Sequence, residues 1–89
     1  MPQYIFDVES VYLKEPEDEL QTHIAEVRTE VIHREKGDIL FEAVIPVAYH
    51  AYGVYPDVKA VASQIPRPSL QREVLFRVKR YVKKLRPFL

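Results

Sequence analysis

The chain can be folded back on itself around Gly37 so that apolar residues from two segments meet on one face. If Glu35-Lys36-Gly37 is a hairpin loop, Gly37 supplies the left-handed conformation that such a loop requires. The pairs in this register are Val31 with Phe41, Thr29 with Ala43, Val27 with Ile45, and Ala25 with Val47. A wrong register rarely places apolar residues on the same face of both strands. The pattern therefore predicts a β-hairpin.

A helix is the alternative for the first arm of this hairpin. Apolar residues recur there at helical spacing, at Leu20, Ile24, Val27 and Val31. Six of the eleven residues from Thr22 to Ile32 are β-branched, which favours a strand. We favour the hairpin; the alternative, with residues 17–35 helical, gives the order β-α-β-α-α.

A further strand is predicted before the hairpin, and the second strand of the hairpin is expected at a sheet edge. Residues 3–13 alternate with period two and are rich in aromatic and β-branched residues, with Tyr4, Phe6, Val8 and Tyr12 on one side. Pro46 has no N–H group for a ladder, so its strand is expected at a sheet edge. On the polar face Glu30 and Glu42 are expected to oppose each other. Such a like-charge pair is destabilising unless Arg28 screens it diagonally.

Two helices are predicted after the sheet. Pro56 and Asp57 suit the start of a short helix with an apolar stripe at Val58, Val61, Ala62 and Ile65. The Pro66-Arg67-Pro68 segment ends it, and Ser69 suits the N-cap of a helix over residues 70–86. That helix has an apolar arc of about 140° and a cationic remainder. We therefore predict one α+β domain over residues 1–89: a three-stranded antiparallel meander followed by two helices packed on one face.

The net charge of zero conceals a separation of charge along the chain. Residues 1–66 hold five basic and twelve acidic residues, a balance of −7, whereas residues 67–89 hold eight basic and one acidic residue, a balance of +7. Within the second helix the cations cluster with one aromatic residue on a predicted interaction face. Its members are Arg72, Phe76, Lys79, Arg80, Lys83 and Lys84. A solvated face without a partner is the plainer interpretation.

Aromatic residues surround a histidine between the hairpin and the helices. Their polar tips and apolar rings suit a ligand pocket or a protein contact. The predicted patch consists of Tyr49, His50, Tyr52 and Tyr55. The plainer interpretation is that these side chains cap the core where the sheet ends.

Catalytic and metal-binding motifs are not found in the sequence. There is no cysteine, and the histidines His23, His33 and His50 lack the spacing of metal ligands. Gly37 and Gly53 are the only glycines and are too far apart for a phosphate-binding loop. We therefore expect no enzyme, no metal and no cofactor. The chain also lacks a signal-peptide pattern and an apolar run long enough for a membrane span, which favours a soluble cytoplasmic protein without a membrane partner.

These patterns lead to two functional hypotheses. The first is a small non-enzymatic protein-interaction or regulatory module that forms a homo-oligomer through its charge-segregated surface or a free sheet edge. Its partner is then itself or another protein. The alternative is a nucleic-acid-binding module that uses the basic helix over residues 70–86, mainly through contacts with phosphates.

Overall fold

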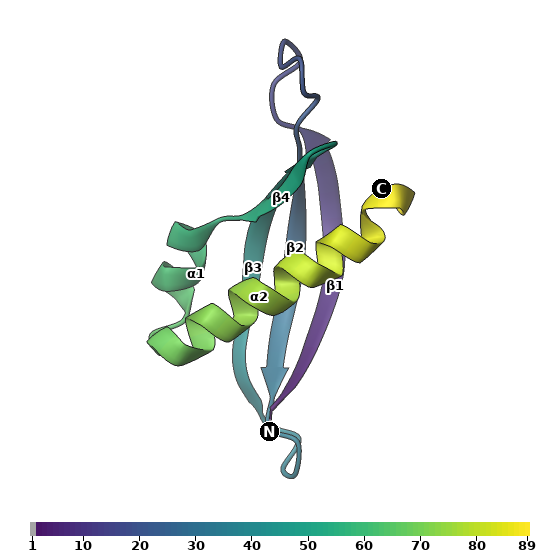
Figure 1. The fold of residues 1–89 in the computed structure, drawn as a ribbon. Helices are drawn as coiled ribbons and strands as arrows, with labels where there is room; N and C mark the ends of the chain where they lie inside the picture. Colours follow the sequence, from purple (N-terminus) through teal and green to yellow (C-terminus); the bar gives the residue numbers. More distant parts are fainter. Residues whose placement is uncertain (1) are drawn as a thin grey trace.

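A computed structural model describes residues 2–89 and contains a four-stranded antiparallel sheet and two α-helices (Figure 1). The elements are β1 (Gln3–Leu13), β2 (His23–Ile32), β3 (Ile39–His50), β4 (Gly53–Pro56), α1 (Val58–Gln64), α2 (Pro68–Leu85) and the 3-10 turn η1 (Arg86–Phe88). The strands pair in chain order. The predicted α+β class is confirmed, and the predicted three-stranded sheet lacked β4.

The β2–β3 hairpin has the register that the sequence predicts. Val31 pairs with Phe41 and Val27 with Ile45, and Gly37 has a φ of 72°. The helical alternative for residues 17–35 is wrong, because β2 occupies most of this range. The loop is longer than predicted, since the register shifts by one residue between Val31 and Ile32.

A bulge in β1 changes which side chains face the core. Val8 pairs with Val27 but Ser10 pairs with Glu26, so one extra residue is inserted in β1. An inserted residue reverses the alternation beyond it. Tyr12 therefore pairs with Ile24 on the face opposite to the core, where it is 48% exposed, and not beside Tyr4 as alternation predicted.

Strand β4 replaces the predicted exit from the sheet. The chain turns at residues 51–52, and His50 pairs with Gly53 and Val47 with Pro56. Pro56 therefore ends a strand instead of starting a helix. Pro46 lies one residue beyond this pairing, so β3 is an edge strand only in its first part, up to Pro46.

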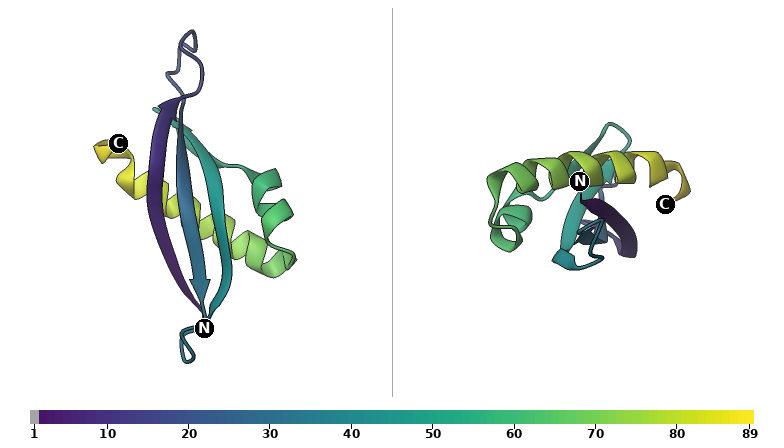
Figure 2. Two further views of the ribbon diagram at one scale, coloured as in Figure 1. Left: turned by 180° about the vertical axis from the view of Figure 1, so that it is seen from behind. Right: turned by 90° about the horizontal axis from the view of Figure 1, so that it is seen from below.

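The core lies between the sheet and α2, which crosses one face diagonally (Figures 1 and 2). The apolar arc of α2 follows the prediction and is buried at Leu70, Val74, Val78 and Val82. Against it pack the inward residues of the central strands, which are Ala25, Val27, Val31, Ala43, Ile45 and Val47. Helix α1 contacts β3 and α2 at the side of the sheet, burying Val61, so only α2 covers the sheet face.

Both helices begin at residues other than those that the sequence predicts. Asp57 is the N-cap of α1, and its Oδ1 accepts a hydrogen bond from the Ala60 N–H (3.0 Å). Helix α2 begins at Pro68 after Arg67, so Ser69 lies inside the first turn and not at the cap. A proline at the first helical position has no N–H to satisfy, which explains why α2 starts one residue before the predicted cap.

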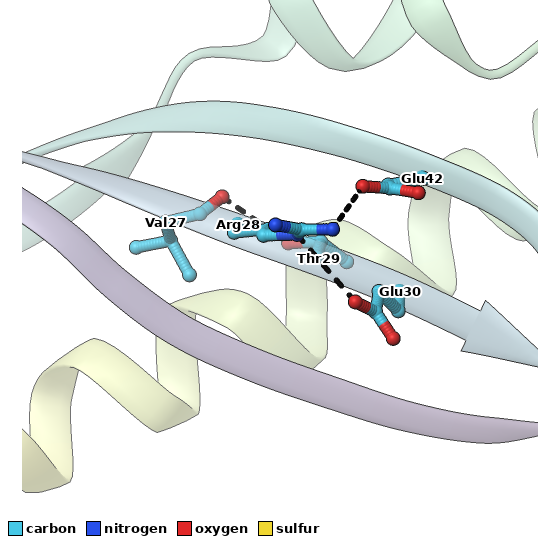
Figure 3. A network of polar contacts seen from close by, with 5 residues as sticks. All are labelled: Val27, Arg28, Thr29, Glu30 and Glu42. Carbon is cyan, nitrogen blue, oxygen red and sulfur yellow. Dashed lines mark hydrogen bonds and ion pairs between the residues drawn. The ribbon is translucent and has the colours of Figure 1, made fainter.

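The other face of the sheet is covered by no element within residues 2–89 (Figure 2). Glu30 and Glu42 oppose each other on this face, as predicted. Arg28 forms ion pairs with both carboxylates (Figure 3). The diagonal screening that the sequence required is therefore present.

Candidate functional site

The two edges of the sheet differ in how they are covered. Beyond β3 lie β4 and α1, and the Gln64 side-chain amide donates a hydrogen bond to the Val44 carbonyl oxygen (3.1 Å). Beyond β1 no strand pairs within residues 2–89. An uncovered edge strand presents unpaired N–H and carbonyl groups and is a template for another chain. Strand β1 is therefore the first candidate interaction site.

The register of the sheet shows which residues of β1 face this edge. The Asp57 N–H donates to the Pro46 carbonyl (2.9 Å), so Pro46 directs its backbone groups away from β2 and does not bond to Glu26. Hydrogen-bonded and non-bonded pairs alternate along a ladder. Glu26 and Arg28 therefore direct their backbone groups towards β1, and Asp7, which pairs with Arg28, directs its own towards β2. The N–H groups of its two neighbours, Phe6 and Val8, lie on the open side, where the Val8 N–H donates a hydrogen bond to the Tyr81 hydroxyl.

The chain terminus projects past the same edge. All three views in Figures 1 and 2 show the C-terminal end extending beyond β1. The Arg86 guanidinium donates to the His50 carbonyl (3.0 Å) and holds η1 to the end of β3. Phe88 is 84% exposed and Leu89 is 41% exposed. Apolar side chains are thus available beside the open edge.

All six residues of the predicted interaction face are exposed to solvent, as the sequence predicts. Four of them, Arg72, Phe76, Arg80 and Lys84, follow each other at intervals of four residues; we call this row the basic ridge. The Arg80 guanidinium lies 5.7 Å from the centre of the Phe76 ring. Glu73 is the only acidic residue of α2, and it pairs with Arg77 (2.7 Å).

A recess of about 300 Å³ lies where the basic ridge meets β1. The residues that line it are Phe6, Arg77, Arg80, Tyr81 and Lys84. The rings of Phe6 and Tyr81 are 5.3 Å apart, and the Arg77 guanidinium lies 4.3 Å above the Tyr4 ring. Burial raises the pKa of the Tyr81 hydroxyl, and the nearby Asp7 carboxylate adds to this effect. The Tyr81 side chain is therefore uncharged at physiological pH.

The sequence does not predict this recess, because the recess forms between segments that are far apart in the chain. Of the five residues that line it, only Arg80 and Lys84 belong to the predicted interaction face. The local signal was present, since Arg77 and Lys84 each lie three or four residues from Arg80 and Tyr81, which places all four on one side of a helix. Only the position of β1 relative to α2 shows that this side borders an aromatic ring.

The predicted aromatic patch is divided between the two faces of the sheet. Tyr49 is 6% exposed and stacks on His23 in the covered layer (ring centres 5.6 Å apart). His50 lies near Tyr55 and Tyr52, with ring centres 5.3 and 6.0 Å away. Successive strand residues point to opposite faces, so neighbours such as Tyr49 and His50 cannot share one surface. The patch therefore comprises three residues, and Tyr49 belongs to the core.

Neither a metal site nor a membrane-spanning helix is found in the part of the chain that the structure describes. Within residues 2–89 no group of three or more acidic or histidine side chains is arranged to hold a metal ion. None of the helices described has the length and apolarity needed to cross a membrane. No family model, no curated protein and no solved structure matches the chain.

Proposed function

We propose that this protein is an interaction module that pairs with a second copy of itself through strand β1. The observation that carries the proposal is the contrast between the two sheet edges. Gln64 and α1 cover the edge of β3, whereas β1 has no cover among the residues described. Antiparallel pairing of two β1 strands joins two sheets around a two-fold axis, which is the commonest symmetry of homo-oligomers.

The size of the core supports this assembly. Tyr4, Phe6 and Val8 pack against the core but remain half-buried because β1 is its outer boundary. A domain of this length buries only about 60–65% of its unfolded surface and gains from further burial. A second β1 covers these side chains, and it brings the exposed Phe88 near the partner's sheet.

The bulge limits where the two strands meet. Bulges interrupt pairing and protect edges. The irregularity lies between Val8 and Ser10, so residues 3–8 form the longer of the two regular parts of β1. We therefore place the contact on residues 3–8, where the outward N–H groups of Phe6 and Val8 lie.

Amide hydrogen exchange at low and high protein concentration tests this arrangement residue by residue. We expect the Phe6 amide to exchange slowly only at high concentration, where light scattering shows twice the monomer mass. The Asp7 amide, which faces β2, should be protected at both concentrations. A monomeric mass at high micromolar concentration, with rapid exchange at Phe6, would exclude the proposal.

A proline substitution provides the matched variant. Val8→Pro removes an N–H group that bonds to the Tyr81 hydroxyl and not to β2, so the strand ladder is kept while the edge is blocked, and an unchanged thermal unfolding midpoint verifies the fold. Val8→Ala is the control, because it shortens the same side chain and keeps the N–H group. We expect Val8→Pro to be monomeric and Val8→Ala to self-associate. A dimeric Val8→Pro would place the contact elsewhere, for example between the acidic sheet face and the basic ridge.

A further inference from the structure

The recess and the basic ridge together carry an excess of positive charge. Arg77 is neutralised by Glu73, whereas Arg80 and Lys84 form no ion pair within residues 2–89. Arg72 continues the ridge towards the start of α2 and is also without an ion pair in that range. From Arg72 to Lys84 the ridge is about 18 Å long at 1.5 Å per residue. Its length and charge suit an extended polyanion.

Aromatic rings accompany these cations. Phe76 is 58% exposed on the surface of α2, and the Arg80 guanidinium lies beside its ring. Tyr81 and Phe6 line the recess beside Arg80. Cationic grooves combined with accessible aromatic rings are typical of proteins that bind single strands, where phosphates contact the cations and bases stack on the rings.

We propose that the basic ridge and the recess bind single-stranded nucleic acid. Arg72, Arg80 and Lys84 contact successive phosphates, one base stacks on Phe76, and another enters the recess beside Tyr81. Because stacking requires an unpaired base, the site selects single strands over duplexes. The basic ridge lies wholly on α2, and Phe6 is the one recess residue that belongs to β1, so binding along the ridge does not require self-association.

The site does not read sequence. Gln71 is the only amide side chain on α2 that suits base recognition, and its Nε2 donates to the Ile65 carbonyl (2.6 Å). It therefore fastens the start of α2 to the preceding segment and is not available for a base. Contacts with phosphates and stacking on aromatic rings are both tolerant of sequence.

An acidic protein segment is the competing occupant. The loop after β1 contains Glu15, Glu17, Asp18 and Glu19, and such a loop from another molecule also satisfies the cations. Binding of such an acidic segment does not require the Phe76 ring or the aromatic recess. The two ligands therefore differ in how strongly their binding depends on Phe76.

Fluorescence anisotropy with labelled oligo-dT and oligo-U strands, in a salt series from about 50 to 200 mM, tests the inference. For three phosphate contacts the logarithm of affinity should fall with the logarithm of salt with a slope of about −2, since each contact on a single strand contributes about −0.7. Arg80→Gln and Lys84→Gln should each reduce this slope by about 0.7. Lys59→Gln, on α1, is the matched control and should leave both affinity and slope unchanged.

The aromatic contribution separates the outcomes. Phe76→Ala should weaken single-strand binding at least about fivefold and leave the salt slope unchanged. Every variant is exposed, so an unchanged thermal unfolding midpoint verifies its fold. No binding at about 50 mM salt overturns the inference. Equal affinity for an oligoglutamate peptide or a duplex of matched charge, or an unaltered affinity of Phe76→Ala, also overturns it and assigns the ridge to non-selective anion binding.

Discussion

Glu30 and Glu42 lie directly opposite each other on the uncovered face of the sheet, and Arg28 holds their charges in one cluster. Its Nε lies 3.5 Å from Glu30 Oε1, and its terminal nitrogen pairs with Glu42 Oε1. A single guanidinium thus offsets a repulsion that spans the two central strands.

Removing this guanidinium should reveal the repulsion. We expect Arg28→Gln to lower the free energy of unfolding by about 0.5–1 kcal/mol, a small value because all three side chains are partly exposed. The double variant Arg28→Gln/Glu42→Gln should recover most of the loss, since it removes one of the two facing carboxylates. Urea denaturation measures both effects. An additive double variant would show that Arg28 acts through packing and not through charge.

The cap of α1 gives a second prediction. Asp57→Ala leaves the Ala60 N–H without its side-chain acceptor and should lower the free energy of unfolding by about 1 kcal/mol. Ser69→Ala is the control, because Ser69 lies inside α2 and its change should stay within about 0.5 kcal/mol. Thermal or urea unfolding of the two variants compares them directly. A larger effect at Ser69 would restore the cap that the sequence predicted.

The parts of the fold that the sequence predicted correctly are those with a repeated pattern. The pairing of Val27 with Ile45 and the buried row from Leu70 to Val82 both follow from periodic apolar residues. The prediction failed where a single residue changes the pattern. One inserted residue in β1 moves Tyr12 to the other face, and a two-residue turn after His50 creates β4. Neither event changes the period of the apolar residues in the sequence.

The candidate sites divide in the same way. The exposure of the predicted interaction face could be predicted, because a helix that buries Val74 and Val78 must turn Arg80 towards solvent. The recess could not, since it depends on where Phe6 of β1 meets Tyr81 of α2. The aromatic patch was predicted because its residues are close in sequence. Neighbouring residues of a strand point to opposite faces of the sheet, so the structure separates Tyr49 from His50.

The packing of α2 gives a third prediction with an internal contrast. Val78 is fully buried, and Val78→Ala removes two methyl groups, leaves a cavity and should lower the free energy of unfolding by about 2 kcal/mol. Phe76 is larger but mostly exposed, so Phe76→Ala should change stability by less than about 0.5 kcal/mol. Urea denaturation of both variants checks the orientation of α2. Similar losses for both would mean that Phe76 packs against another part of the protein.

Asp18 gives the last prediction, which concerns acid stability. The Thr22 side chain, and then the Leu20 N–H, donate hydrogen bonds that lower the pKa of Asp18 below its ordinary value of 3.8. Because the folded pKa is the lower one, the stability that Asp18 contributes is fully present above about pH 4 and is lost as the pH falls through the folded pKa. Titration of the Asp18 carboxyl carbon by NMR should show this lowered pKa, and Thr22→Val should bring it back towards 3.8. Asp18→Asn should make stability less sensitive to acid over the same range; a carboxyl that titrates at or above its ordinary pKa would contradict the hydrogen bonds of this loop.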